Sequence, residues 1–131
     1  MLERFLALFL FLLLTYILIR RFNSKKVNSA QVLQINLSNT NPLLPTILYF
    51  STEQCVQCKS TQALILLKLQ DEGKQFNLIS LDALEEIELI KHLNIKTVPA
   101  TALLSHDKKL RFVNNGYASD ILLNKQLMRL S

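Results

Sequence analysis

The only two cysteines of this 131-residue chain, Cys55 and Cys58, are separated by two residues. An apolar run rich in β-forming residues, 47–50, leads into the pair. A run with a helical pattern, 59–72, leads out of it and stops at Gly73. A C-x-x-C pair at a strand-to-helix turn is typical of a redox-active pair. The unpaired N–H groups and the positive dipole end of a helix N-terminus favour a thiolate on the first cysteine, and the thiolate is the reactive form.

Two other interpretations of the cysteine pair stay open at this point. Cysteines are often small buried hydrophobic residues, but the polar side chains on both sides of this pair are more typical of an exposed loop than of a core. A C-x-x-C pair is also half of a common zinc site, yet zinc normally takes four protein ligands. The chain has no third cysteine, and His92 and His106 are not at zinc-finger spacing. We therefore expect no metal and assign neither histidine a role.

The cysteine pair and three features around it resemble the thioredoxin family, and more closely its small membrane-anchored bacterial members. The matching residues, in chain order, are Phe50, Cys55-x-x-Cys58-Lys59, Asp82 and Val98-Pro99-Ala100-Thr101. They correspond to an apolar strand, the start of the active-site helix, the end of a later strand and a cis-proline with its neighbours. The resemblance covers residues 31–131. A proline about forty residues after the pair, in βα order, makes it more specific than a lone C-x-x-C.

The resemblance implies an α/β, thioredoxin-like fold in which helices cover both faces of a central mixed sheet. It also implies a thiol–disulfide oxidoreductase whose partners are disulfide-containing proteins or small thiols. Cys55 is then the nucleophile, and Cys58 is the more buried cysteine that resolves the mixed disulfide. The backbone of Val98, placed by a cis Pro99, would bind the substrate strand. An ordinary trans-proline before an edge strand is the alternative for Pro99.

The chain departs from the family pattern around the cysteines. Val56 and Gln57 replace the Gly-Pro of the family, and Gln54 stands where the family has Trp. Ala63 stands where the active-site helix usually has a kinking proline. The loss of the Trp and the Gly-Pro, together with the loss of a buried Asp at Tyr49, favours a second function as the alternative to the oxidoreductase. It is a non-catalytic thioredoxin-like binding module that recruits a membrane or envelope partner.

Two further departures concern proton transfer. Tyr49 stands where thioredoxin has a buried Asp, and Leu78 stands where it has a nearby Lys. Their joint loss is physically consistent, because a lone buried charge costs several kcal/mol. The missing carboxylate is the group expected to take a proton from Cys58. Water or an exposed neighbour such as Glu53 must replace it, so we expect resolution of the mixed disulfide to be slow relative to attack.

The formal net charge of +5 is concentrated at the N-terminus. Residues 1–30 hold five Lys and Arg against one Glu, whereas the remainder holds ten Lys and Arg against nine Asp and Glu. The remainder therefore has no basic face that would bind nucleic acid. The chain has no P-loop and no dinucleotide-binding fingerprint, so we expect no cofactor. Its length allows one modest domain, which we expect to be a monomer.

The fifteen residues 5–19 carry no charge and would form about 22 Å of helix. A bilayer requires about 20 residues, and apolar Leu2 and Phe22 with snorkelling of Arg4 and Arg20 close the difference. An uncleaved single-span anchor is favoured over a cleaved secretory signal, because no small-x-small site follows the run. One Arg precedes the run and four Lys or Arg follow it, so the positive-inside rule predicts a cytoplasmic domain. An extracytoplasmic domain is the alternative.

We therefore divide the chain into a transmembrane anchor at 1–22, a linker at 23–30 and a thioredoxin-like domain at 31–131. Hydrophobic patterning predicts the elements of that domain. In chain order they are strand 33–37, strand 46–51, helix 55–72, strand 76–81, helix 84–93, a hairpin of strands 101–104 and 110–113, and helix 119–130.

Two of these helices carry specific packing predictions. The helix after the cysteines is expected to turn Ala63, Leu64, Leu67 and their neighbours toward the core. The spacing of Asp82 and Glu85 resembles a capping box at the start of the next helix. That helix carries an apolar stripe, which we assign to the core: Leu84, Ile87 and Ile90.

Overall fold

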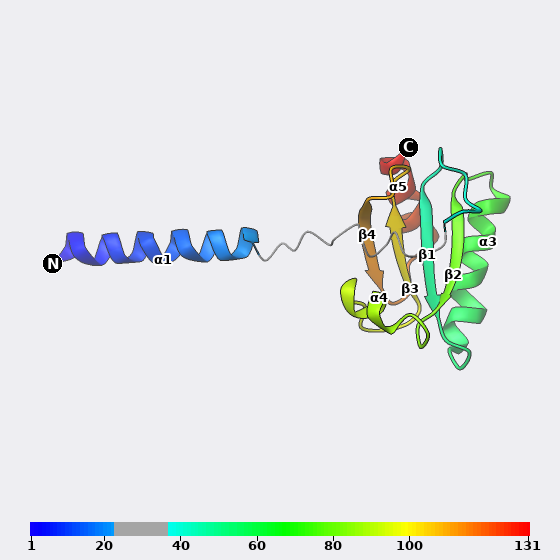
Figure 1. Cartoon of the computed structure of the whole chain (residues 1–131), viewed down its shortest axis with the longest axis horizontal. Coiled ribbons are helices and arrows are strands. Elements are labelled where there is room, and N and C mark those ends of the chain that lie inside the picture. Colours follow the sequence, from blue (N-terminus) through cyan, green and yellow to red (C-terminus); the bar gives the residue numbers. More distant parts are fainter. Residues whose placement is uncertain (23–36) are drawn as a thin grey trace.

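A four-stranded sheet forms the centre of the domain, and helices α3, α4 and α5 pack on it (Figure 1). The computed structural model describes residues 1–22 and 37–131. The elements, in chain order, are α1 (Leu2–Phe22), β1 (Thr46–Ser51), η1 (Cys58–Gln62, a π-helix), α3 (Ala63–Asp71), β2 (Asn77–Asp82), α4 (Ile87–His92), β3 (Ala100–Leu104), β4 (Leu110–Asn115) and α5 (Asp120–Leu130). The predicted strand at 33–37 lies outside the described residues except for its last residue, Leu37.

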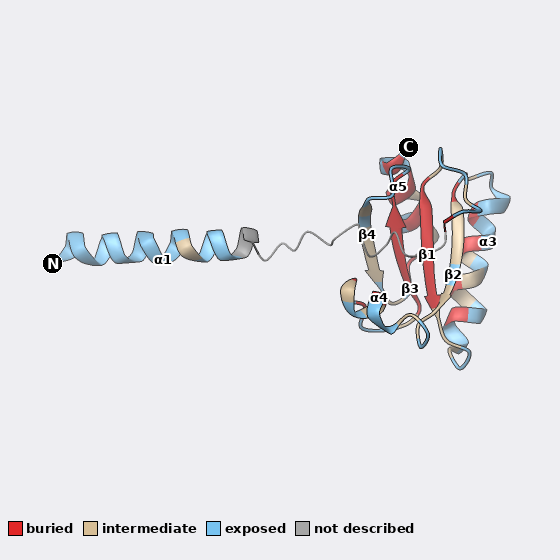
Figure 2. Ribbon diagram, in the orientation of Figure 1, coloured by how far each residue is buried: buried red, intermediate tan, exposed pale blue. Residues whose placement is uncertain are grey.

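β1 is a central strand because its sequence is apolar on both faces. It pairs in parallel with β2 and antiparallel with β3, and β3 pairs antiparallel with β4, which gives the order β2-β1-β3-β4. The central strands β1 and β3 are buried, whereas the edge strands β2 and β4 are only partly buried (Figure 2). The predicted mixed sheet and the predicted hairpin are confirmed.

Alternate side chains of β1 enter two separate cores. Ile47 and Tyr49 pack with residues of α3 and α5, whereas Leu48 and Phe50 pack with Leu89 and other residues of α4. Helices therefore cover both faces of the sheet, as the fold class requires (Figure 1). The cysteine pair packs in the first of these cores, which we call the α3/α5 core.

The helix α5 begins and ends where the sequence predicts. Ser119 is its N-cap, and the Ser119 hydroxyl accepts a hydrogen bond of 3.2 Å from the N–H of Leu122. This bond satisfies one of the donors that a helix start leaves unpaired. An ion pair of 2.7 Å between Lys68 and Asp120 joins α3 to the first turn of α5.

Of the residues predicted to face the core, Ala63 packs against it, but the prediction is wrong for Leu64 and Leu67. They are 58% and 52% exposed, whereas Leu66 and Leu69 are buried. The helix at the cysteines has Val56 and Gln57 in α-helical conformation and then continues as the π-helix η1 before α3. The run 63–67 is apolar at every position, so its pattern does not define which face of the helix is buried. The buried face follows Gln62, Leu66 and Leu69 instead.

Asp82 and Glu85 do not form the predicted capping box. Asp82 is the last residue of β2, and its Oδ1 accepts a hydrogen bond of 2.8 Å from the N–H of Leu84 in a local turn. The helix α4 therefore begins later, at Ile87, and has only six residues. Leu84 and Ile87 are exposed, so of the predicted stripe only Ile90 packs against the core.

The segment Leu2–Ile19 of α1 is long and apolar enough to cross a membrane, and none of it is buried inside the structure. A signal sequence near an N-terminus meets the same criteria of length and composition. By length and composition the segment fits either a membrane span or a signal sequence. The predicted linker at 23–30 lies outside the described residues, and the boundaries of anchor, linker and domain stay predictions.

Candidate functional site

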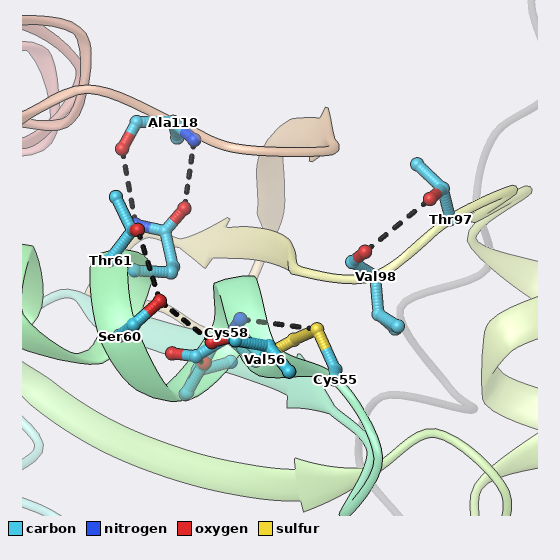
Figure 3. The surroundings of a disulfide bond; sticks show 10 residues. Cys55, Val56, Cys58, Ser60, Thr61, Thr97, Val98 and Ala118 are labelled. Atoms are coloured by element: carbon cyan, nitrogen blue, oxygen red, sulfur yellow. Dashed lines mark hydrogen bonds between the residues drawn. A yellow bond between two sulfur atoms is a disulfide. The ribbon is translucent and has the colours of Figure 1, made fainter.

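Cys55 and Cys58 form a disulfide at the carboxyl end of β1 (Figure 3). The chain leaves β1 at Ser51 and turns, with the N–H of Cys55 bonded to the carbonyl of Thr52 at 3.2 Å. It enters the π-helix at Cys58, which is 1% exposed. Cys55 is only half-buried, so a partner from solution reaches Cys55 first.

The π-helix η1 and α3 follow each other without a break, and we call them together the site helix. The start of this helix directs a backbone N–H at the sulfur of Cys55, the more exposed of the two cysteines. The N–H of Cys58 donates a hydrogen bond of 3.1 Å to Sγ of Cys55. An N–H group at a helix N-terminus favours negative charge on its acceptor, and therefore a thiolate on Cys55 once the disulfide is reduced. The next residue, Lys59, is exposed, so its charge is screened by solvent and adds little.

Tyr49 packs in the same core as Cys58 and is 6% exposed. Its hydroxyl donates a hydrogen bond of 2.7 Å to the backbone carbonyl of Cys58. The same carbonyl accepts the N–H of Ala63, the bond that closes the π turn. Burial raises the pKa of Tyr49. At neutral pH the side chain is therefore an uncharged donor and not a proton acceptor.

Gln62 is a site residue that the sequence analysis did not single out. Its fully buried side chain pairs with the backbone of Ala118 at both ends of the amide. Nε2 donates to the Ala118 carbonyl at 3.1 Å, and the Ala118 N–H donates to Oε1 at 2.8 Å (dashed lines at Ala118 in Figure 3). The pair anchors the site helix to the segment before α5. A signal was present, since Gln62 stands four residues before Leu66 and seven before Leu69 on the buried stripe.

Val98 and Pro99 come immediately before β3, and the peptide bond between them is cis. Because β3 starts opposite the end of β1, with Ala100 paired to Phe50, this bond lies at the same end of the sheet as the cysteines. Val98 and Cys55 pack against the same core, and Figure 3 shows Val98 across from Cys55. The fold thus brings all the predicted site residues together.

The two histidines lie on other elements. His92 ends α4, and His106 lies between β3 and β4. Within residues 1–22 and 37–131, no group of three or more His, Cys, Asp or Glu side chains is placed to hold a metal ion. The zinc interpretation of the cysteine pair therefore finds no ligand set in the described part of the chain.

Comparison with protein-family models and with curated proteins finds no match. Solved structures do match. Mitochondrial thioredoxin 3 of Saccharomyces cerevisiae, in its oxidised form, gives a TM-score of 0.59 at 23% identity, over 72% of this chain and 85% of that one. Thioredoxin-2 of the malaria parasite secretion machinery gives 0.57 at 24% identity, over 66% and 82%. The exposed lipoprotein thioredoxin of Streptococcus pneumoniae gives 0.57 at 11% identity, over 68% and 87%.

This is the thioredoxin fold. Within it, the departures of the chain have definite structural consequences. A buried hydroxyl, that of Tyr49, stands where the resemblance places a buried acid. Ala63, where a kinking proline is usual, keeps its N–H and uses it to close the π turn onto Cys58. Gln54, where Trp is usual, is exposed. The thioredoxin fold here holds its cysteine pair with an added hydrogen-bond donor and without the acid.

Proposed function

We propose that this chain is a membrane-tethered thiol–disulfide oxidoreductase that works through Cys55 and Cys58. One observation carries the proposal. The half-buried Cys55 and the buried Cys58 form a disulfide at a helix start, and the N–H of Cys58 is directed at Sγ of Cys55. The thioredoxin fold around the pair supports it. The partners are disulfide-containing proteins or small disulfides and thiols.

The exchange proceeds through a mixed disulfide. The thiolate of Cys55 attacks one sulfur of the partner disulfide, and the other partner sulfur leaves as a thiolate. Cys58 then loses its proton and attacks Sγ of Cys55. The bond between Cys55 and the partner breaks, the second partner thiolate leaves, and the Cys55–Cys58 disulfide forms. The partner gains two electrons and the pair loses two; the reverse sequence oxidises a partner dithiol.

Val98 and Pro99 form the substrate-binding part of the proposed site. The backbone of Val98 lies just before β3, at the end of the sheet that also holds the cysteines. An extended partner segment that pairs with this backbone by β-augmentation would bring its own sulfur to Cys55. Backbone pairing of this kind is tolerant of sequence, which suits an enzyme that acts on several disulfides.

The α1 helix is the proposed membrane anchor, with a linker at 23–30 and the redox domain at 31–131. One Arg precedes the apolar run and four Lys or Arg follow it, so we place the domain on the cytoplasmic side by the positive-inside rule. Labelling of a reduced pair with a membrane-impermeant maleimide on sealed cells tests the orientation. Labelling only after lysis is expected. Labelling of intact cells would assign the domain to the outside.

Reduction of insulin disulfides tests the catalytic function. Full-length protein in detergent, supplied with dithiothreitol, is expected to speed insulin precipitation well above the rate with dithiothreitol alone. The Cys55→Ser variant, which keeps the size of the side chain but lacks the nucleophile, is the matched control and is expected to give the blank rate. A wild-type rate equal to the blank would refute the enzyme. That result would favour the alternative function, a non-catalytic binding module, which the replacements at Gln54 and Tyr49 also favour.

A further inference from the structure

A groove of about 410 Å³ opens beside the cysteine pair, and Cys58 forms part of its wall. It lies between the ends of β1 and β2 and the start of the site helix. The polar residues that line it are Tyr49, Ser51, Thr52, Glu53, Lys59, Ser80 and Asp82. Although Cys58 is almost fully buried, it thus borders a polar space large enough for several water molecules.

The polar character of this groove follows from the strand pattern of β2. Alternate residues of a strand share a face, so Leu78, Ser80 and Asp82 point to the same side of the sheet. Leu78 packs against the α3/α5 core, and the next two positions on that face are polar. Asp82 pairs in register with Ser51, two residues beyond Tyr49. The face therefore changes from apolar to polar where it reaches the site helix.

The resolving step needs an acceptor for the proton of Cys58, and the groove holds four titratable side chains besides that thiol. The hydroxyl of Tyr49 is protonated and already donates a hydrogen bond to the Cys58 carbonyl. A lysine ammonium such as Lys59 has no acceptor atom. The two carboxylates, Glu53 and Asp82, remain.

These two carboxylates differ in how firmly they are held. Glu53 is exposed on the turn before the pair. Asp82 is half-buried at the end of a strand, and its Oδ1 is held by the N–H of Leu84 at 2.8 Å. A carboxylate on a rigid element loses less entropy when it accepts a proton through ordered water than one on a mobile side chain does.

We propose that Asp82 is the proton acceptor for Cys58 during resolution of the mixed disulfide, reached through water in the groove. The thiol of Cys58 gives its proton to a groove water, which passes a proton to the Asp82 carboxylate. The Cys58 thiolate then attacks Sγ of Cys55, and the partner leaves as a thiolate. Asp82 afterwards returns its proton to solvent through the open side of the groove. The inference rests on the proposed function. It assigns to Asp82 the role of base, which the uncharged hydroxyl of Tyr49 does not fill.

Stopped-flow reaction with dithiobis(nitrobenzoate) separates the two steps. Attack by Cys55 releases one equivalent of the coloured thionitrobenzoate, and resolution by Cys58 releases a second. The test variant is Asp82→Asn, which keeps an oxygen to accept the Leu84 N–H but removes the base. The matched control is Glu53→Gln, which removes the other carboxylate of the groove.

We expect Asp82→Asn to leave the first phase unchanged and to slow the second about tenfold at neutral pH. The rate of the second phase in Asp82→Asn should become proportional to hydroxide concentration. It should reach the wild-type rate at alkaline pH, where hydroxide removes the proton of the Cys58 thiol directly. Glu53→Gln should stay within about twofold of wild type at both phases. Ser80→Leu, which fills part of the groove and leaves residue 82 as Asp, should reproduce the loss and serves if Asp82→Asn does not fold.

An unchanged second phase in Asp82→Asn would overturn the inference. So would a slowing by the same factor at every pH, which would indicate a structural effect, or a loss in Glu53→Gln instead. Failure of the proposed function looks different. In that case wild-type protein would not speed insulin reduction, whatever the groove variants do.

Discussion

The hydroxyl of Tyr49 donates a hydrogen bond of 2.7 Å to the backbone carbonyl of Cys58. That carbonyl also accepts the N–H of Ala63 across the π turn. A side chain of the central strand therefore holds the first residue of the site helix, at the position where the family resemblance places a proton acceptor. The position has changed from an acid–base role to a structural one, and the first two predictions follow from this change.

Replacing Tyr49 with Phe is expected to lower the free energy of unfolding by about 1 kcal/mol, the net value of one buried hydrogen bond. The loss stays near this value because the Cys58 carbonyl keeps its bond from Ala63. Urea unfolding of both proteins measures it. Tyr117→Phe, at a tyrosine that is 43% exposed, is the matched control and should change little. Equal stability of Tyr49→Phe and wild type would mean that the hydroxyl contributes nothing.

Alkaline pH should destabilise the wild-type domain partly through Tyr49. Burial raises the pKa of Tyr49 in the folded state above the ordinary value of about 10. The stability that this group contributes is therefore fully present below pH ~10 and is lost as pH rises through the folded-state pKa. Unfolding free energies measured in steps from pH 8 to 11 should fall more steeply above pH ~10 for wild type than for Tyr49→Phe. Parallel curves would contradict this assignment.

The buried amide of Gln62 gives a third prediction. In Gln62→Leu the N–H and carbonyl of Ala118 lose their partners, and Ala118 is fully buried. Each unpaired group costs about 1–3 kcal/mol, and the added apolar burial offsets only part of this. We expect a net loss of about 2 kcal/mol or more in urea unfolding. The control is Gln70→Leu at an exposed position of α3, which should stay within about 0.5 kcal/mol.

The parts of the fold that the sequence predicts correctly are those with local signals. The continuous apolar run predicts β1, and turn residues between two short apolar runs predict the β3–β4 hairpin. Ser119 marks the start of α5 through its own side chain. The two cysteines and the cis-proline positions follow from spacing and family resemblance. Apart from the proline, which is recognised by its distance from the cysteine pair, each of these signals lies within a few residues of the feature that it predicts.

The features that the sequence missed depend on contacts between distant segments. Gln62 and Ala118 are 56 residues apart, and no pattern around Gln62 alone reveals its partner. The run 63–67 is apolar at every position, so the sequence alone does not show that Leu64 and Leu67 are exposed and that Leu66 is buried. The groove beside Cys58 exists because β1, β2 and the helix start meet in space. The groove makes Asp82 a candidate proton acceptor, whereas the sequence suggested only water or Glu53 for that role.

Removal of residues 1–22 is expected to yield a soluble, folded domain. None of the apolar segment Leu2–Ile19 is buried inside the structure, so its loss removes no core contact. The urea midpoint of the shortened protein should match that of the full chain in detergent, and gel filtration should show a monomer. A shortened protein that aggregates or lacks a cooperative transition would show that the domain needs its N-terminal segment.

The roles of the two cysteines predict an asymmetry in covalent trapping. Cys55 is half-buried and receives the Cys58 N–H, so it attacks first, whereas Cys58 is 1% exposed and reaches only the sulfur beside it. Cys58→Ser should therefore form mixed disulfides with partners and fail to resolve them. Cys55→Ser should form few.

Non-reducing gels of the two variants, expressed in cells and blocked with a maleimide at lysis, make the comparison. Cys58→Ser is expected to show additional high-mass bands that dithiothreitol removes. The double serine variant sets the background, and Cys55→Ser should match it. Because a serine preserves the size of either side chain, a difference between the single variants reflects the order of attack. Equal trapping by both would contradict Cys55 as the attacking sulfur, and trapping by Cys55→Ser alone would reverse the two roles.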